Sequence, residues 1–209
     1  MKNKSIVDYI PLIGIIIFVA LYIYASILYP GGSQADLQSI GYDWIHNYWC
    51  NLMNDQAMNR QPNPAKPFAV VAMVVLCISL LVFFMQFALV FEGGKIWGHI
   101  IKLNAILSMS FAMLMFTAYH DVMTMLSSLF GLFVVIGIIR AVYRSNLTIY
   151  KIGGFLCLVL LGINNYIYYS HDGIGVLPMV QKITFVVVLI WILGLNFEMV
   201  EMKRNKNIG

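Results

Sequence analysis

The chain has 209 residues, of which 61% are hydrophobic and only 11% are charged, and its formal net charge is +4. Soluble domains average about 45–50% apolar and about 25% charged residues, so this composition excludes an ordinary soluble domain and predicts a polytopic membrane protein. The basic residues are dispersed over the polar connections, which argues against nucleic acid as a partner.

Six apolar runs are each close to the about 20 residues that a helix needs to cross a bilayer core. The first run is too long for a signal-peptide core of about 7–15 residues, so we expect it to be retained as a helix. Turn-forming stretches separate the runs. We therefore predict an all-α bundle of six transmembrane helices, in a single membrane domain over residues 1–209. The predicted crossings are residues 10–29, 68–91, 103–119, 122–142, 153–169 and 178–200.

The long connection over residues 30–67 contains one stretch, residues 41–54, that predicts an amphipathic helix. At about 100° per residue, its apolar and polar side chains fall on opposite faces. Because Trp and Tyr favour the headgroup level of a bilayer, we expect this helix to lie in the membrane interface after the first crossing. The apolar face holds Trp44, Ile45, Tyr48, Trp49, Leu52 and Met53, and the polar face holds Asp43, His46, Asn47, Cys50, Asn51 and Asn54.

Basic residues are distributed unequally between the two sides of the predicted bundle. Ten of the thirteen Lys and Arg residues fall on the side that carries the termini. Because cytoplasmic segments carry the excess of Lys and Arg, we predict a cell-membrane protein with both termini in the cytoplasm and residues 30–67 outside. The ten are Lys2, Lys4, Lys95, Lys102, Arg140, Arg144, Lys151, Lys203, Arg204 and Lys206, and the other three are Arg60, Lys66 and Lys182.

Three of the four histidines fall on the predicted outer side, together with several aspartates. Neutral imidazole and carboxylate are ligands that zinc accepts, so His46, His120, His171 and Asp43 are candidate metal ligands. A bound metal would lower the pKa of a water molecule that it coordinates. Asp121 and Asp172 are the candidate catalytic carboxylates, with Asp121 placed to act as general base.

The same residues also fit structural roles. Asp121 directly precedes a predicted helix, where Asp is a favoured N-cap. The sequence His171-Asp172-Gly173 fits a turn. The spacing of Asp43, His46 and Cys50 matches no metal motif, and Cys50 also fits an unreactive thiol. Both interpretations stay open at this point.

Lys182 is an ionisable residue about one turn inside the last apolar run, where such residues are functional by default, although a lysine can also extend outward to the interface. We expect Asp172 or Asp121 to be its partner. Asn165 lies about one and a half turns below His171 and would extend a polar pocket inward. Together with Trp49, Lys182 and Asn165 are the candidate substrate-binding residues.

Three short motifs in the first outer loop resemble those of a prokaryotic family of six-helix membrane proteins of unknown function. They are Tyr29-Pro30-Gly31-Gly32, Gly41-Tyr42 and residues 47–52. That family is distantly similar to the Frag/DRAM/Sfk membrane proteins, whose eukaryotic members are associated with lipid remodelling. The resemblance implies a lipid-facing role. Here Cys50-Asn51-Leu52 stands where the family often carries Ser-Asp-Leu.

Two functions follow from these patterns. The first is a lipid-associated scaffold or lipid-organising protein with an outer-leaflet polar pocket. The alternative is a metal-dependent membrane hydrolase that acts on lipid headgroup or acyl bonds, with zinc as its cofactor. Membrane lipid is the expected partner in both, and other membrane proteins are candidate partners. The scarcity of charges at mid-membrane argues against a transporter.

Overall fold

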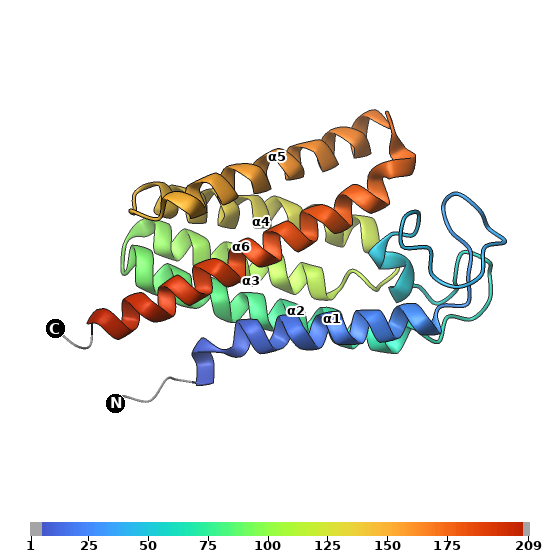
Figure 1. Cartoon of the computed structure of the whole chain (residues 1–209), viewed down its shortest axis with the longest axis horizontal. Coiled ribbons are helices and arrows are strands. Elements are labelled where there is room, and N and C mark those ends of the chain that lie inside the picture. The colour runs from blue at the N-terminus through green and yellow to red at the C-terminus, as the bar shows by residue number, and fades with distance from the viewer. Residues whose placement is uncertain (1–5, 207–209) are drawn as a thin grey trace.

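The computed structural model describes residues 6–206, and six long helices dominate it (Figure 1). Each helix is long and apolar enough to cross a membrane, so the prediction of an all-α bundle of six membrane helices is confirmed. The helices are α1 (Ile10–Leu28), α2 (Lys66–Phe87), α3 (Ile96–Met113), α4 (His120–Tyr143), α5 (Thr148–Ser170) and α6 (Leu177–Lys206), and the short helical turns are η1 (Ile6–Asp8), η2 (Trp49–Met53), η3 (Ala88–Glu92) and η4 (Ile174–Val176).

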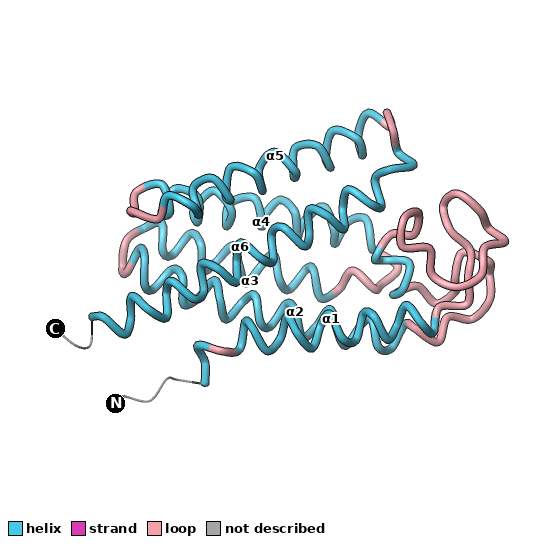
Figure 2. The backbone as a smooth tube through the Cα atoms, viewed as in Figure 1, coloured by secondary structure: helices cyan, strands magenta, loops and turns pink. Residues whose placement is uncertain are grey.

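The two ends of the bundle differ in character (Figure 2). At one end, which we call the cap face, residues 30–65 form a folded cap. At the other end, the termini face, η1 lies beside the last turns of α6. There Asp8 forms an ion pair with Lys203 at 2.7 Å, and its backbone oxygen accepts a hydrogen bond from Asn196 at 3.1 Å. Both ends of the described chain therefore lie on the same side of the bundle, as an even number of crossings requires.

Helix α3 begins and ends earlier than the apolar pattern predicts. It covers Ile96–Met113 instead of residues 103–119, because it starts directly after the Gly93-Gly94 turn. Residues 114–119 form turns, which the Thr117 hydroxyl holds by donating to the Leu114 carbonyl at 2.8 Å. As a consequence, His120 begins α4 and does not close α3.

Helices α1 and α2 approach closely because small residues line their contact. A Cβ atom at Gly14 would lie 1.6 Å from the Ser79 oxygen, so only glycine allows this approach. Ala25, Ala69 and Ala72 are fully buried in the core cluster on the cap side of the bundle. Small residues at helix contacts of this kind are typical of membrane helices, where close van der Waals packing drives association.

The termini face contains a buried ion pair. The carboxylate of Glu92, only 4% exposed, accepts a hydrogen bond from Arg140 at 2.8 Å. The Arg140 guanidinium also lies over the Trp97 ring, 4.7 Å from its centroid. These contacts join the end of the α2 segment to α3 and α4, so the pair holds three helices in register.

The prediction of an amphipathic helix over residues 41–54 is wrong. Residues 44–46 form a turn, and only Trp49–Met53 is helical, as the 3₁₀ turn η2. The two predicted faces are mixed as well. Asn47 and Asn51 are 0% and 3% exposed, whereas Trp44 and Ile45 are 49% and 53% exposed. Hydrogen bonds within the cap set the conformation of residues 41–54, and helical periodicity does not predict it.

The cap is built from contacts between its own turns, most of which join residues 6 to 12 positions apart. Isolated β-bridges pair Gly31 with Ile40 and Gln56 with Pro62. The Asn63 amide donates to the carbonyls of residues 51, 52 and 54 at 2.9–3.3 Å. At Gly32, with φ +81°, a Cβ atom would lie 2.4 Å from the Asn59 nitrogen, so this crossing requires glycine.

Candidate functional site

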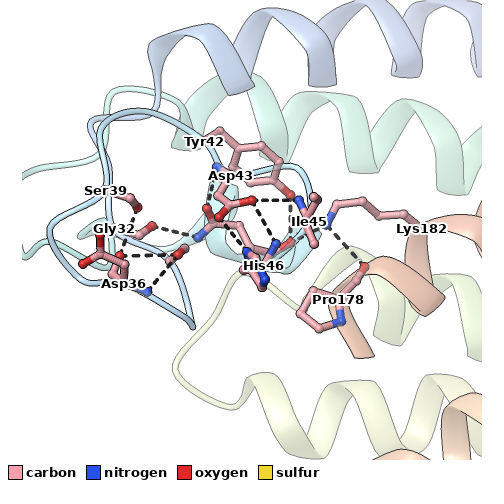
Figure 3. A network of polar contacts seen from close by, with 11 residues as sticks. Gly32, Asp36, Ser39, Tyr42, Asp43, Ile45, His46, Pro178 and Lys182 are labelled. Carbon is pink, nitrogen blue, oxygen red and sulfur yellow. Dashed lines mark hydrogen bonds and ion pairs between the residues drawn. The ribbon is translucent and has the colours of Figure 1, made fainter. Parts of the chain in front are cut away.

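Lys182 lies in the first two turns of α6 and points into the cap (Figure 3). Its side chain is only 9% exposed. The ammonium group donates to the backbone carbonyl of Asn47 and to that of Pro178, the latter at 3.3 Å. It also lies 5.6 Å from the centroid of the Tyr42 ring. A helix residue is thus tied to a loop residue 135 positions earlier in the chain.

The predicted partners of Lys182, Asp172 and Asp121, form no ion pair with it. Within residues 6–206 its hydrogen-bond acceptors are the two carbonyl oxygens, although Asp43 lies within electrostatic range. The expectation of a direct carboxylate partner was therefore wrong. The Asn47 carbonyl is available because the turn before η2 leaves it outside any helix, and no sequence pattern signals this.

Asn47 is the residue of this site that sequence reasoning placed incorrectly. Its amide nitrogen donates to the Gly32 carbonyl at 2.9 Å, and its amide oxygen accepts from the Asp43 N–H at 2.8 Å. The Tyr42 hydroxyl donates to the Asn47 carbonyl at 3.3 Å. Asn often bonds to nearby backbone, which gives a weak local signal. The contact with Gly32, fifteen residues earlier in the chain, has no local sequence signal.

Trp49 packs between the cap and two helices. Its ring stacks on Phe18 and Tyr22 of α1, with centroids at 5.5 and 4.8 Å, and contacts Phe185 of α6 at 5.0 Å. Its indole nitrogen and the Tyr22 hydroxyl are both buried, and neither finds a hydrogen-bond partner among residues 6–206. Two unsatisfied polar groups therefore lie in one aromatic cluster, and its member Phe185 follows Lys182 by three residues in α6.

Asp43 and His46 form a local pair at the edge of this site. The His46 Nδ1 atom lies 2.8 Å from one Asp43 carboxylate oxygen, and the other oxygen accepts the N–H groups of Ile45 and His46 at 2.9 and 3.1 Å. Burial acts to raise the pKa of Asp43, but the hydrogen bonds from His46 and Ile45 outweigh it and hold the pKa below its usual value. Asp43 is consequently ionised at neutral pH.

Cys50, in η2, is half-buried. Burial raises the pKa of its thiol from 9.0 to about 11, and backbone hydrogen bonds offset only part of this. The charges of Asp121 and Lys182 also act on the thiol, so both residues lie within electrostatic range of it. Since the thiolate is the reactive form of cysteine, we expect Cys50 to react slowly at neutral pH.

The remaining predicted site residues lie outside this network. The His120 ring nitrogen lies 3.2 Å from the carboxylate of its neighbour Asp121, whose side chain is 94% exposed. His171 ends α5 in a left-handed conformation with φ +61°, and it is exposed. Asp172 is also exposed, 3.5 Å from the Tyr166 hydroxyl. Asn165 is exposed and donates to the Leu161 carbonyl of its own helix at 2.8 Å, so it does not line a pocket beneath the cap.

The predicted zinc ligands are not grouped in this arrangement. Among residues 6–206, no three His, Cys, Asp or Glu side chains are grouped closely enough to hold a metal ion. Of the four candidates, only Asp43 and His46 contact each other, and that contact occupies the Nδ1 atom of His46. A zinc site normally needs three or four protein ligands at about 2.0–2.3 Å.

No protein-family model, no curated protein and no solved structure matches this chain. The resemblance to the family related to the Frag/DRAM/Sfk proteins therefore stays a prediction. The function has to be inferred from the contacts of the chain's own residues.

The thiol of Cys50 provides a direct test of the cap. In a variant whose Cys77 and Cys157 are replaced by alanine, we expect a maleimide to modify Cys50 about tenfold more slowly at neutral pH than a thiol with a pKa of 9.0. The pKa of about 11 lowers the thiolate fraction about a hundredfold, and the greater nucleophilicity of a more basic thiolate offsets part of this. The rate should rise about tenfold per pH unit without levelling off up to about pH 10. A rate that saturates near pH 9 would show that the cap leaves the thiol open to water.

Proposed function

We propose that this multi-pass membrane protein is a lipid-associated protein that holds a lipid headgroup at its cap face. Lys182, Trp49 and Tyr22 supply the hydrogen-bond donors for this headgroup. The observation that carries the proposal is that the indole N–H of Trp49 and the Tyr22 hydroxyl are buried without a partner among residues 6–206, in the aromatic cluster that joins the cap to α1 and α6. This role agrees with the lipid-organising function that the sequence favours.

Donors exceed acceptors around Lys182. An ammonium group has three N–H bonds, and two are directed at the carbonyls of Asn47 and Pro178, so one is left. The indole N–H of Trp49 can only donate, and the Tyr22 hydroxyl can also donate. Leaving a buried polar group without a partner costs about 1–3 kcal/mol. A ligand rich in oxygen acceptors, such as a lipid phosphate or glycerol ester, would remove this cost.

The charge of the site favours the same kind of ligand. Lys182 makes no ion pair within residues 6–206, and Asp43 acts on it only over a longer range. Cations in membrane helices usually pair with an anionic group or reach the interface. Lys182 lies in the second turn of α6, so we expect it near the level of the phospholipid phosphates when the helix crosses a bilayer. A phosphate group would therefore compensate its charge.

Two conservative substitutions test this proposal. Tyr22→Phe removes only the hydroxyl, and Trp49→Phe removes the indole N–H while keeping an aromatic ring. We expect each to weaken lipid retention about tenfold, since hydrogen bonds to charged groups contribute about 1.5–3 kcal/mol. Lipid phosphorus per chain after purification in mild detergent is the measurement.

Tyr24→Phe and Trp44→Phe are matched controls, because both aromatic side chains are largely exposed, at 46% and 49%. Without lipid, Tyr22→Phe is expected to raise the melting temperature, since it removes an unsatisfied buried hydroxyl. If this variant melts higher but keeps all of its lipid phosphorus, the hydroxyl has no lipid partner and the proposal is wrong.

A metal-dependent membrane hydrolase is the second candidate function. Of its predicted ligands, only Asp43 and His46 contact each other. The zinc content of the purified protein tests it: about one zinc per chain, lost on replacing His46 with Ala, would favour the hydrolase. Zinc below about 0.1 per chain would leave the lipid-binding proposal as the better explanation of the cap.

A further inference from the structure

The termini face carries a pocket that is separate from the cap-face site. Its volume is about 240 Å³, far above the about 10–15 Å³ that a single water needs, so it has room for a polyatomic ligand. It is lined by the α2–α3 turn, the end of α4 and the last turns of α6. Figure 1 shows these segments at the end of the bundle opposite the cap. The lining residues are Val90, Phe91, Glu92, Lys95, Ala141, Arg144, Ser145 and Met202.

The pocket has a net positive charge. The Glu92 carboxylate is already compensated by Arg140 at 2.8 Å, so it does not cancel the other cations. Lys95 and Arg144 are exposed side chains that make no ion pair within residues 6–206. The two free cations at its mouth therefore favour a ligand with a negative charge.

Backbone groups add to this preference. Helix α3 begins at Ile96, directly after Lys95, and no side chain caps its N-terminus. The N–H groups of a first helical turn carry partial positive charge and commonly bind phosphate oxygens. The preceding Gly93 and Gly94 have open space where a Cβ atom would lie, so no side chain at these two positions shields the backbone.

The rest of the pocket wall is apolar, from Val90, Phe91, Ala141 and Met202. A free inorganic ion would gain nothing from this wall, whereas the glycerol and acyl carbons of a lipid would bury apolar surface against it. The positive charge at the mouth of the pocket and its apolar wall together favour an amphiphilic ligand with an anionic headgroup.

We propose that this pocket binds the phosphate of an anionic phospholipid, with Lys95 and Arg144 paired to its oxygens and the N-terminus of α3 as an additional donor. The glycerol and first acyl carbons then lie against Val90 and Met202. This site is independent of the cap-face site, because it lies at the opposite end of the bundle and shares no residue with it.

The test is a titration of phosphatidylglycerol into the purified full-length protein in a neutral detergent, followed by native mass spectrometry. We expect Lys95→Gln/Arg144→Gln to weaken binding about 30-fold, because each cation near a membrane surface contributes about 1 kcal/mol.

Lys102→Gln/Lys151→Gln is the matched control, since it removes the same charge from α3 and α5 outside the pocket. The charge-preserving Lys95→Arg/Arg144→Lys should keep most of the affinity. An equal loss in the control would overturn the proposal.

Phosphatidylcholine and inorganic phosphate separate the possible ligands. On the unmodified protein we expect about tenfold weaker binding of phosphatidylcholine and no displacement of phosphatidylglycerol by millimolar phosphate. Displacement by phosphate would show that the pocket binds free inorganic phosphate instead of a lipid. Equal affinity for the two lipids would show that the pocket does not prefer an anionic headgroup, which would contradict the proposal. The cap-face variants Tyr22→Phe and Trp49→Phe should leave the effect of Lys95→Gln/Arg144→Gln unchanged. A negative result for the cap-face proposal would therefore leave the test of this pocket valid, and the reverse also holds.

Discussion

Replacing Arg140 with methionine is expected to lower the free energy of unfolding by about 3–5 kcal/mol, because removing one partner leaves a buried charge without compensation. The partner is Glu92, which is 4% exposed and accepts a hydrogen bond from Arg140 at 2.8 Å. The substitution also removes the cation over the Trp97 ring. The contact between the α2–α3 turn and α4 should loosen as a result.

Equilibrium unfolding in mixed micelles of mild detergent and dodecyl sulfate measures this loss. The double variant Glu92→Gln/Arg140→Met should recover more than half of it, since no buried charge is left. Arg204→Met is the surface control: Arg204 pairs with Glu201 at 3.6 Å and both side chains are largely exposed, so its loss should stay below about 1 kcal/mol. A loss of that small size for Arg140→Met would show that water reaches Glu92.

Replacing Asn47 with leucine is expected to destabilise the cap by at least about 2 kcal/mol. Leucine has a similar branched shape, although it is larger, and it leaves the Gly32 carbonyl and the Asp43 N–H without their partner, at about 1–3 kcal/mol for each buried group. The backbone carbonyl that receives Lys182 is retained in the variant but loses its fixed position. The cap should therefore open more often while the six helices stay folded.

Limited trypsin digestion reports this opening, since Arg60 is an exposed residue of the cap. We expect cleavage after Arg60 to be at least tenfold faster in Asn47→Leu than in the unmodified protein. Asn54→Leu makes the same chemical change at an exposed cap position and should leave the rate unchanged. Equal rates in the two variants would mean that the Asn47 amide does not hold the cap.

The six membrane helices were predictable because the signal is local. An apolar run of about 20 residues must form a helix in a bilayer, where each backbone group needs a partner within its own segment. Helix ends were less predictable. Helix α3 starts seven residues before its apolar run because the Gly93-Gly94 turn sets its beginning. Such an end depends on backbone conformation more than on hydrophobicity.

The site was predictable only in part. Lys182 stood out because a charge in a membrane helix is uncommon, and Trp49 stood out because tryptophan favours the membrane interface. Their partners were not predictable. The Asn47 carbonyl meets Lys182 across 135 positions, and Trp49 meets α1 and α6 at the same point. A periodic pattern contains no information about such contacts.

By itself, the sequence determined the membrane environment, the number of crossings and the placement of both chain ends on one side. These follow from hydrophobicity summed over long segments, which neighbouring segments cannot reverse. Only the tertiary structure decided the form of residues 41–54, because the cap backbone and Lys182 satisfy the Asn47 amide and carbonyl outside a helix. It likewise decided that Lys95 and Arg144, 49 positions apart, line one pocket while the predicted zinc ligands do not form one group. Polar groups are placed by their hydrogen-bond partners, and in this protein those partners come from distant parts of the chain.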